Sequence, residues 1–213
     1  MEDDFKLGVV IPYYRTGRLR EVLFKELVNL LLLQKVLESY IDICIYEDGS
    51  YSAWLDLIQV RNFKVLREKE NKGISYARNR CIDYLLNKGC NYIVMIDSDD
   101  YVDYDYFRNI WLTWLREQRK YYFTDFEILG KVKERKGLQE RITGIVLHKS
   151  LLENARFNEE TRYAEDVEFN DKYLRDKLIE PYYIDTIYHY NFGIDKKCLS
   201  YQAQLERGDG LND

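Results

Sequence analysis

The stretch YIVMIDSDDYVDYD, residues 92–105, joins an apolar run to a group of carboxylates. Residues 92–96 form the uninterrupted apolar run expected of a strand inside a parallel sheet. Asp97, Asp99 and Asp100 follow at once, so three carboxylates stand within four residues. Because carboxylates packed this closely repel one another, they need a compensating positive charge, and a hard divalent cation prefers oxygen ligands of this kind.

A second interpretation is that these carboxylates form a solvated acidic turn, since acidic residues favour the N-terminal end of a helix. We assign Asp103 and Asp105 to that structural role, at the start of a helix. Asp97 and Asp99 directly follow the apolar strand, and we assign them to metal binding. Few protein ligands would leave positions for phosphate oxygens and water.

Strands and helices alternate on both sides of this stretch. Apolar runs predict further strands at 6–11, 41–46, 63–66, 121–126, 141–148 and 179–187. Apolar residues at helical spacing and helix-end signals predict helices at 18–39, 53–59, 75–87 (with Ser75 as N-cap), 103–119 and 149–154. The segment TRYAEDVEFN, residues 161–170, leads into a last helix that runs to about residue 177. This alternation predicts an α/β fold, in which a mostly parallel central sheet is flanked by helices on both faces.

The chain has 213 residues, enough for one domain with a substantial core. Its formal net charge of −5 disfavours a protein that binds nucleic acid by neutralising phosphates over a broad surface. The four cysteines show no CxxC spacing, which fits reduced thiols in a reducing compartment. The acidic N-terminus lacks the apolar core of a signal peptide, and the longest apolar run, residues 27–37, is too short to cross a bilayer. We therefore expect a cytoplasmic protein without a transmembrane segment, either free or at the inner face of the membrane.

Ligands of parallel α/β sheets bind at the carboxyl ends of the strands. The second predicted strand ends in EDGS, residues 47–50, and the acidic cluster ends a later strand, so both are expected to face one crevice. Asp48 has acceptor oxygens suited to a nucleobase N–H or a sugar hydroxyl. The alternative is an ordinary Asp-Gly turn without a ligand.

Two further segments carry charged residues near predicted helix starts. Arg78 follows the turn NKG, where a basic side chain can meet phosphate, although an exposed helix face explains it equally well. The segment AEDVEF contains Glu165, Asp166 and Glu168, and one of these carboxylates has the chemistry of a general base. The alternative for this segment is charge complementarity at a helix N-terminus.

The chain has two histidines, His148 and His189. A structural role is the ordinary expectation for each of them. His189 follows the last predicted strand, where it can approach the aspartate edge and add a nitrogen ligand to the metal.

Five segments, taken in order, resemble the motifs of the family 2 glycosyltransferases, which have the GT-A fold. GVVIPYYRTG resembles their opening strand, IYEDGS their Val-Asp-Asp-Gly-Ser turn, and ENKGISYARNRCIDY their Asn-x-Gly…Ala-Arg-Asn segment. YIVMIDSDDYV is similar to their Asp-x-Asp strand, and GIVLHKSLLENARFNEETRYAEDVEF resembles the acceptor-side segment that ends in Glu-Asp-x-x-Phe. The resemblance runs from about residue 6 to residue 192, and five motifs in the right order make it specific.

The resemblance implies a nucleotide-binding surface in the first part of the chain. Pro12 and Tyr13 would border the nucleotide base, Asp48 would contact the uracil of a UDP-type donor, and Arg78 would lie close to the nucleotide. Glu47 replaces the first Asp of the family's Asp-Asp pair. We keep Glu47 in the nucleotide-binding set because its carboxylate still accepts hydrogen bonds, while its longer reach bears on which donor is used.

The resemblance also implies the metal and the catalytic base. Asp99 would be the main ligand to the Mn²⁺ or Mg²⁺ that bridges the diphosphate. Asp97 would hold the ribose or help to bind this metal, with His189 as the further ligand considered above. Asp166 would be the base. A second departure from the family, Arg15 in place of the usual Asn, also leaves the donor open.

The implied activity is the inverting transfer of one sugar from a nucleotide-sugar, with UDP as the expected nucleotide, to a hydroxyl acceptor. The expected acceptor is a saccharide or lipid-linked saccharide in surface polysaccharide or glycan synthesis; a protein or a modified DNA base is the alternative. A non-catalytic protein that binds nucleotide or sugar on the same fold is the competing class, and a sugar nucleotidyltransferase is a third. We divide the single domain, residues 1–213, into a nucleotide-sugar half (about 1–100), an acceptor and base half (about 101–195) and a tail (202–213).

Overall fold

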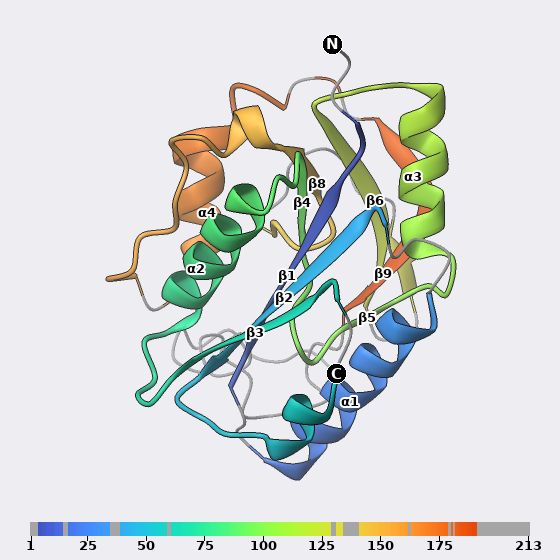
Figure 1. The fold of residues 1–213 in the computed structure, drawn as a ribbon. Helices are drawn as coiled ribbons and strands as arrows, with labels where there is room; N and C mark the ends of the chain where they lie inside the picture. Colours follow the sequence, from blue (N-terminus) through green and yellow to red (C-terminus); the bar gives the residue numbers. More distant parts are fainter. Residues whose placement is uncertain are drawn as a thin grey trace.

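The computed structural model describes residues 4–14, 17–34, 39–58, 61–128, 131–133, 141–161, 163–178, 180 and 182–190. Arg15 and the predicted tail at 202–213 lie outside these residues. The described residues form one mixed sheet with the strand order β3-β2-β1-β4-β8-β6-β9-β5, and β7 pairs with β6 (Figure 1). The strands are β1 (Leu7–Tyr13), β2 (Ile41–Asp48), β3 (Phe63–Glu68), β4 (Tyr92–Met95), β5 (Tyr101–Val102), β6 (Tyr121–Ile128), β7 (Lys131–Lys133), β8 (Val146–His148) and β9 (Tyr183–Tyr190).

Helices pack on both faces of this sheet. They are α1 (Arg18–Leu33), α2 (Ile74–Asn87), α3 (Tyr106–Arg116) and α4 (Glu165–Phe169), with short helical turns η2 (Ala53–Leu57), η3 (Lys149–Leu151) and η4 (Asn170–Leu174). In the ribbon, α2 and α4 lie on one side of the central strands, and α1 and α3 lie on the other (Figure 1). The predicted α/β fold with a central sheet flanked by helices is confirmed.

The first four strands of the sheet order, β3, β2, β1 and β4, are parallel to one another. The chain adds β2 and β3 on one side of β1 and then returns to add β4 on the other side. Such a reversal opens a crevice at the carboxyl ends of the two strands between which it occurs. The crevice therefore lies where β1 ends at Tyr13 and where β4 leads into Asp97. Beyond β4 the sheet is mixed, because β8 runs antiparallel to both β4 and β6.

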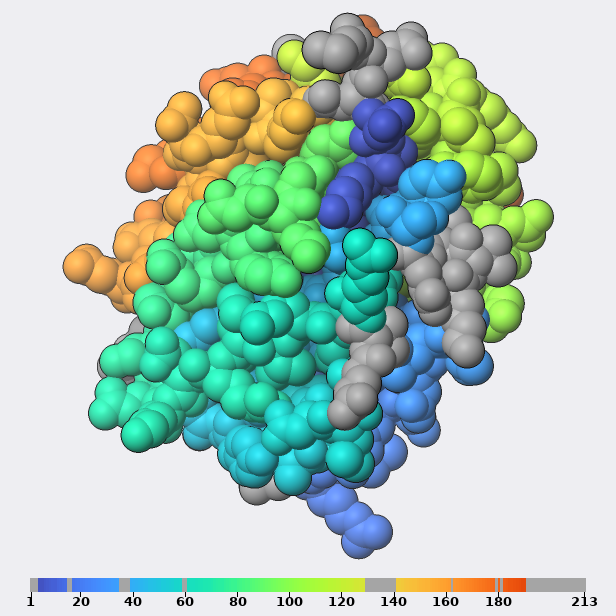
Figure 2. Space-filling view, viewed as in Figure 1, coloured from blue at the N-terminus to red at the C-terminus, as the bar shows by residue number. Residues whose placement is uncertain are grey.

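Strand β1 shows how the two faces of the sheet bury different helices. Leu7, Val9 and Ile11 belong to the apolar core that also contains Phe24 of α1. Val10 points to the other face and joins the core that contains α2 and α4. In a space-filling view from the direction of Figure 1, residues of β3 and α2 form the middle of the molecular surface (Figure 2).

Several predicted boundaries need correction. Ser75 is not the N-cap: α2 begins at Ile74, and its N-cap is Gly73 with φ of 94°, a left-handed conformation that favours glycine. The predicted strand at 141–148 is reduced to β8, since residues 143 and 144 form a turn in which Gly144 has φ of 75°. The predicted long helix after residue 161 is the short α4 continued by the wide turn η4. Among the described helices, none has the length and apolar character needed to cross a membrane.

Candidate active site

The turn after β2 is fastened to the turn that precedes α2. The Asp48 carboxylate is buried and accepts hydrogen bonds from the backbone N–H groups of Lys72, at 2.6 Å, and Gly73, at 2.8 Å. Burial raises the pKa of Asp48, although these two N–H groups pull it down. Gly49 has φ of 67°, and a Cβ on it would lie 2.4 Å from the backbone nitrogen of Asn71. Both carboxylate oxygens of Asp48 therefore hold the loop, and its predicted contact with a base stays a prediction.

Glu47 forms a cross-strand ion pair. It faces Arg67 in the β2–β3 register, and the Arg67 Nε lies 2.7 Å from the buried Glu47 carboxylate. Arg67 also contacts Asp56 of η2 at 2.8 Å. The longer side chain at this position, compared with the family's Asp, is used to reach β3.

Pro12 and Tyr13 end β1 at the crevice. Pro12 is buried opposite Tyr46 in the β1–β2 register. The Tyr13 ring is buried and stacks on Phe24 of α1, with the ring centres 4.0 Å apart. Its ring therefore packs in the core instead of offering a face to a nucleobase. That these two residues border the base remains a prediction that would rest on their backbone position.

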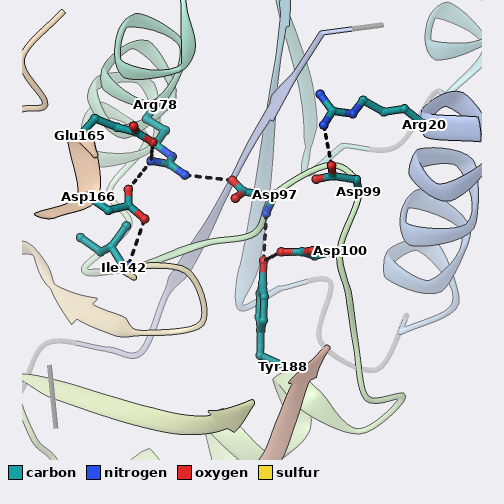
Figure 3. Close-up of polar contacts among 9 residues, drawn as sticks. All are labelled: Arg20, Arg78, Asp97, Asp99, Asp100, Ile142, Glu165, Asp166 and Tyr188. Carbon is teal, nitrogen blue, oxygen red and sulfur yellow. Dashed lines mark hydrogen bonds and ion pairs between the residues drawn. The ribbon is translucent and has the colours of Figure 1, made fainter. Parts of the chain in front are cut away.

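A buried arginine joins three carboxylates from two distant segments (Figure 3). Arg78 of α2 donates to Asp97 at 3.0 Å, to Glu165 at 3.0 Å and to Asp166 at 2.5 Å. Its side chain is only 1% exposed and lies over the ring of Phe157, 5.2 Å from the ring centre. The structure thus brings together three of the predicted site residues: Arg78, Asp97 and Asp166.

The charges in this cluster do not balance, since three carboxylates share one guanidinium. Burial opposes the charge of Arg78, but Asp166, Asp97 and Glu165 more than compensate and raise its pKa, so Arg78 stays a cation. Burial raises the pKa values of Asp166 and Glu165, against the lowering effect of Arg78. The cluster therefore favours a further cation or a proton.

The backbone before Asp166 is strained. Ala164 has φ of 59° and ψ of 28°, the left-handed conformation, which costs a non-glycine residue about 1–2 kcal/mol. This residue precedes α4 and turns Glu165 and Asp166 toward Arg78. Asp166 also accepts a hydrogen bond from the Ile142 N–H at 3.3 Å. Strain of this kind is common at functional sites, where the surrounding structure maintains it.

Asp99 lies in the acidic loop, residues 97–100, which follows β4, and it pairs with Arg20 instead of Arg78 (Figure 3). The Arg20 guanidinium of α1 lies 2.5 Å from the Asp99 carboxylate. The side chains of Arg20 and Asp99 are 13% and 19% exposed. Burial raises the pKa of Asp99, although Arg20 lowers it.

Strand β9 holds the acidic loop through Tyr188. The buried Tyr188 hydroxyl donates to Asp100 at 2.6 Å and accepts from the Asp97 N–H at 3.1 Å. Burial and the nearby Asp100 raise the pKa of Tyr188 well above its ordinary value, which keeps this hydroxyl protonated as a donor. Asp100 thus fixes the backbone on which Asp97 and Asp99 stand.

Asp103 and His189 form a second contact between β9 and the segment that follows the acidic loop. Asp103 was expected to begin a helix; it instead accepts from the Ile187 N–H at 2.8 Å and contacts His189 Nε2 at 2.7 Å. The other ring nitrogen of His189 lies 3.3 Å from Glu127, and Tyr101 stacks on its ring. Asp105 is at the N-cap of α3, as expected, without a side-chain capping hydrogen bond.

The carboxylates that follow β4 fit a divalent cation that takes most of its ligands from phosphate and water and only a few from the protein. Across the described ranges, no three His, Cys, Asp or Glu side chains are grouped to hold a metal, so Asp97, Asp99 and His189 do not form one cluster. Asp99 and Asp97 supply hard carboxylate oxygens beside a locally negative cluster, which suits Mn²⁺ or Mg²⁺ bound jointly with phosphate oxygens and water.

Sequence reasoning missed three residues of this site. They are Arg20, which contacts Asp99, Tyr188, which contacts Asp100, and Ile142, whose N–H contacts Asp166. Each of them lies outside the short motif that contains its carboxylate partner. For Arg20 the available signal was a basic residue in the first turn of a helix that follows the first strand.

The fold is similar to those of several solved glycosyltransferase structures. The crystal structure of TarS 1–349 from S. aureus superposes with a TM-score of 0.70 at 18% identity, covering 88% of this chain and 60% of that one. The same protein in complex with UDP-GlcNAc gives a TM-score of 0.67 at 18% identity, covering 88% and 58%. The mannosyltransferase PcManGT from Pyrobaculum calidifontis, in complex with GDP-Man and Mn²⁺, gives 0.62 at 14% identity, covering 97% and 62%. The fold is therefore the GT-A fold of the glycosyltransferases.

The family follows from the sequence itself. Residues 8–197 match the model of glycosyl transferase family 2, so the chain belongs to that family. A search of curated protein sequences gave no significant match. The chain spans 60% of the length of the TarS 1–349 structure that it resembles.

Proposed function

We propose that this protein is a metal-dependent, inverting glycosyltransferase that moves one sugar from a nucleotide-sugar, with UDP as the nucleotide, to an acceptor hydroxyl. The observation that carries the proposal is the cluster around Arg78. It joins Asp97, which follows the donor-side strand β4, to Asp166 at the start of α4. This contact supports the proposal, because a carboxylate at the carboxyl end of β4 is where nucleotide-binding sheets of this kind hold their ligand.

The donor side consists of residues about 1–100. Pro12, Tyr13 and the two turns that Asp48 fastens together would border the base, and Asp97 would face the ribose. Asp99 would hold Mn²⁺ or Mg²⁺, with Asp97 beside it. When bound, this cation would stabilise the negative charge of the departing diphosphate. TarS structures contain UDP and UDP-GlcNAc, and PcManGT contains GDP-Man and Mn²⁺, which supports this class of donor and cofactor.

The acceptor side consists of residues about 101–195, with Asp166 as the base. Asp166 would take the proton of the acceptor hydroxyl as that oxygen attacks the anomeric carbon. The bond from that carbon to the diphosphate breaks on the opposite side, so the anomeric configuration inverts. Burial raises the pKa of Asp166, which makes this carboxylate a better proton acceptor than an exposed one. We propose a saccharide or lipid-linked saccharide acceptor, and a cytoplasmic reaction at or near the membrane surface.

A donor screen tests this function. A panel of UDP-, GDP- and dTDP-sugars is measured with Mn²⁺, by thermal shift and by release of the nucleoside diphosphate. Asp99→Ala should abolish the metal-dependent stabilisation by UDP. Asp105→Ala is the matched control, because its carboxylate is exposed at the start of α3. Equal UDP affinity with and without metal would remove the metal assignment. Binding without turnover of any donor, alone or with saccharide acceptors, would favour a non-catalytic binding protein.

A further inference from the structure

Arg20 is a charged residue beside the acidic loop, and the proposed function gives it no role. It lies in the first turn of α1 and meets Asp99 across 79 residues of sequence. Helix α1 is held against the end of β1 by the stack of Phe24 on Tyr13. The position of Arg20 is therefore set by the packed core of the donor half, and its guanidinium is directed at Asp99 (Figure 3).

The pair has the properties of an internal counter-ion. Both side chains are largely shielded from water, so their charges attract each other more strongly than those of an exposed pair. A divalent cation that binds Asp99 would be placed close to the Arg20 guanidinium, and two like charges around one carboxylate repel each other. That repulsion is relieved when more negative charge enters the site. A nucleoside diphosphate supplies this charge, and a guanidinium binds phosphate oxygens well because its planar donors match their geometry.

We propose that Arg20 is an exchangeable partner of Asp99 that becomes a diphosphate-binding residue. In the free protein it neutralises Asp99. When a divalent cation and a nucleoside diphosphate bind together, the cation takes the Asp99 carboxylate and Arg20 turns to the phosphate oxygens. The inference rests on the proposed function, because it assumes that Asp99 is the metal ligand.

This exchange has a thermodynamic consequence. In the absence of nucleotide, Arg20 competes with the cation, so the cation binds weakly. With nucleotide present, Arg20 contributes to binding, so cation and diphosphate strengthen each other. By linkage, the factor by which UDP tightens Mn²⁺ binding equals the factor by which Mn²⁺ tightens UDP binding. Arg20 should account for a large part of that shared factor.

The test measures this factor in variants of Arg20. Mn²⁺ binding is followed by electron paramagnetic resonance with and without UDP, and UDP binding by calorimetry with and without Mn²⁺. Arg20→Gln should bind Mn²⁺ alone about tenfold more tightly than the wild type and UDP with Mn²⁺ about tenfold more weakly. Arg18→Gln is the control, because Arg18 is exposed in the same turn and its loss changes the net charge equally. Arg20→Lys keeps the charge and should restore the weak binding of Mn²⁺ alone, whereas UDP with Mn²⁺ should still bind more weakly because the planar guanidinium is lost.

The outcomes separate the two proposals. If the wild type shows no joint binding of Mn²⁺ and UDP, the proposed function fails. If the wild type binds both and Arg20→Gln has the same two affinities, the proposed function stands and the role of Arg20 is overturned. Parallel weakening of Mn²⁺ alone and of UDP with Mn²⁺ would also overturn it, since a merely structural residue would give that result. Thermal unfolding of each ligand-free variant identifies such a loss of structure, and if Arg20→Gln does not fold, Arg20→Lys with unchanged UDP affinity overturns the proposal.

Discussion

Arg78 and Asp166 lie 88 residues apart in the sequence, and their side chains meet at 2.5 Å. The same guanidinium contacts Asp97 beside the donor-side strand. The proposed base is therefore held in place by the residue that also holds the proposed donor carboxylate. The buried Arg78 guanidinium thus connects the proposed donor side to the proposed base.

Replacing the proposed base should separate binding from catalysis. Asp166→Asn keeps the shape of the side chain and should leave the affinity for UDP with Mn²⁺ within about twofold. Transfer should fall by roughly 10²- to 10⁴-fold, the usual contribution of a general base. Glu165→Gln is the control, since Glu165 contacts the same Arg78 at 3.0 Å. Near-normal turnover in Asp166→Asn, or an equal loss in Glu165→Gln, would assign the base elsewhere.

Removing the buried guanidinium should destabilise the fold. Arg78→Met leaves Asp97, Glu165 and Asp166 without their shared cation and should lower the free energy of unfolding by about 3–5 kcal/mol. Arg80→Met, on an exposed position of the same helix, should change it by no more than about 0.5 kcal/mol. Urea unfolding of both variants gives the comparison. A loss below about 1 kcal/mol for Arg78→Met would mean that the carboxylates find other compensation.

The turn after β2 should not tolerate a side chain at Gly49. Its φ of 67° is unfavourable for alanine, and the added Cβ would lie 2.4 Å from the Asn71 backbone. Gly49→Ala should therefore lower the free energy of unfolding by about 1–3 kcal/mol and weaken UDP binding, because the clash opens the joined turns. Gly17→Ala is the matched control: its φ is 169°, and an added Cβ meets no atom within 4 Å. Equal stability and equal UDP affinity of Gly49→Ala and Gly17→Ala would contradict this prediction.

The stability of the ligand-free protein should depend on pH through the acidic cluster. Burial raises the pKa of Asp166 and of Glu165, so the folded state binds more protons than the unfolded state above their ordinary values near 4. These groups stabilise the fold fully below those ordinary values, and this contribution is lost as the pH rises through the raised values. The fall in unfolding free energy from about pH 4 to neutrality should be smaller in Asp166→Asn than in the wild type. Identical pH slopes would show that Asp166 does not titrate in this window.

The fold and the central carboxylates could be predicted because they rest on local patterns. The apolar run of β4 and the turn after β2 are each visible within a few residues, and the sheet topology then brings Asp48 and Asp97 to the same edge. The partners of these carboxylates could not be predicted in this way. Arg20 meets Asp99 only because α1 packs in one particular rotation against β1, and that rotation depends on the whole core.

Asp103 illustrates why a local pattern can mislead. An acidic residue just before an amphipathic helix is typical of a helix start, and that signal led to the wrong assignment. In the structure the competing partner is β9, whose backbone N–H at Ile187 and His189 ring both reach the Asp103 carboxylate. The strand pairing of β5 with β9 brings them together, and no short-range feature of the sequence announces it.

The attachment of the acidic loop to β9 also bears on how the protein matures during translation. Tyr188 is made 88 residues after Asp100, so β1 to β4 leave the ribosome long before the strand that steadies the loop. Domains fold as units, and a nascent chain that stops before β9 lacks the hydroxyl that secures Asp97 and Asp100. The proposed donor site should thus be completed late in synthesis, only after Tyr188 has been made and has joined the sheet.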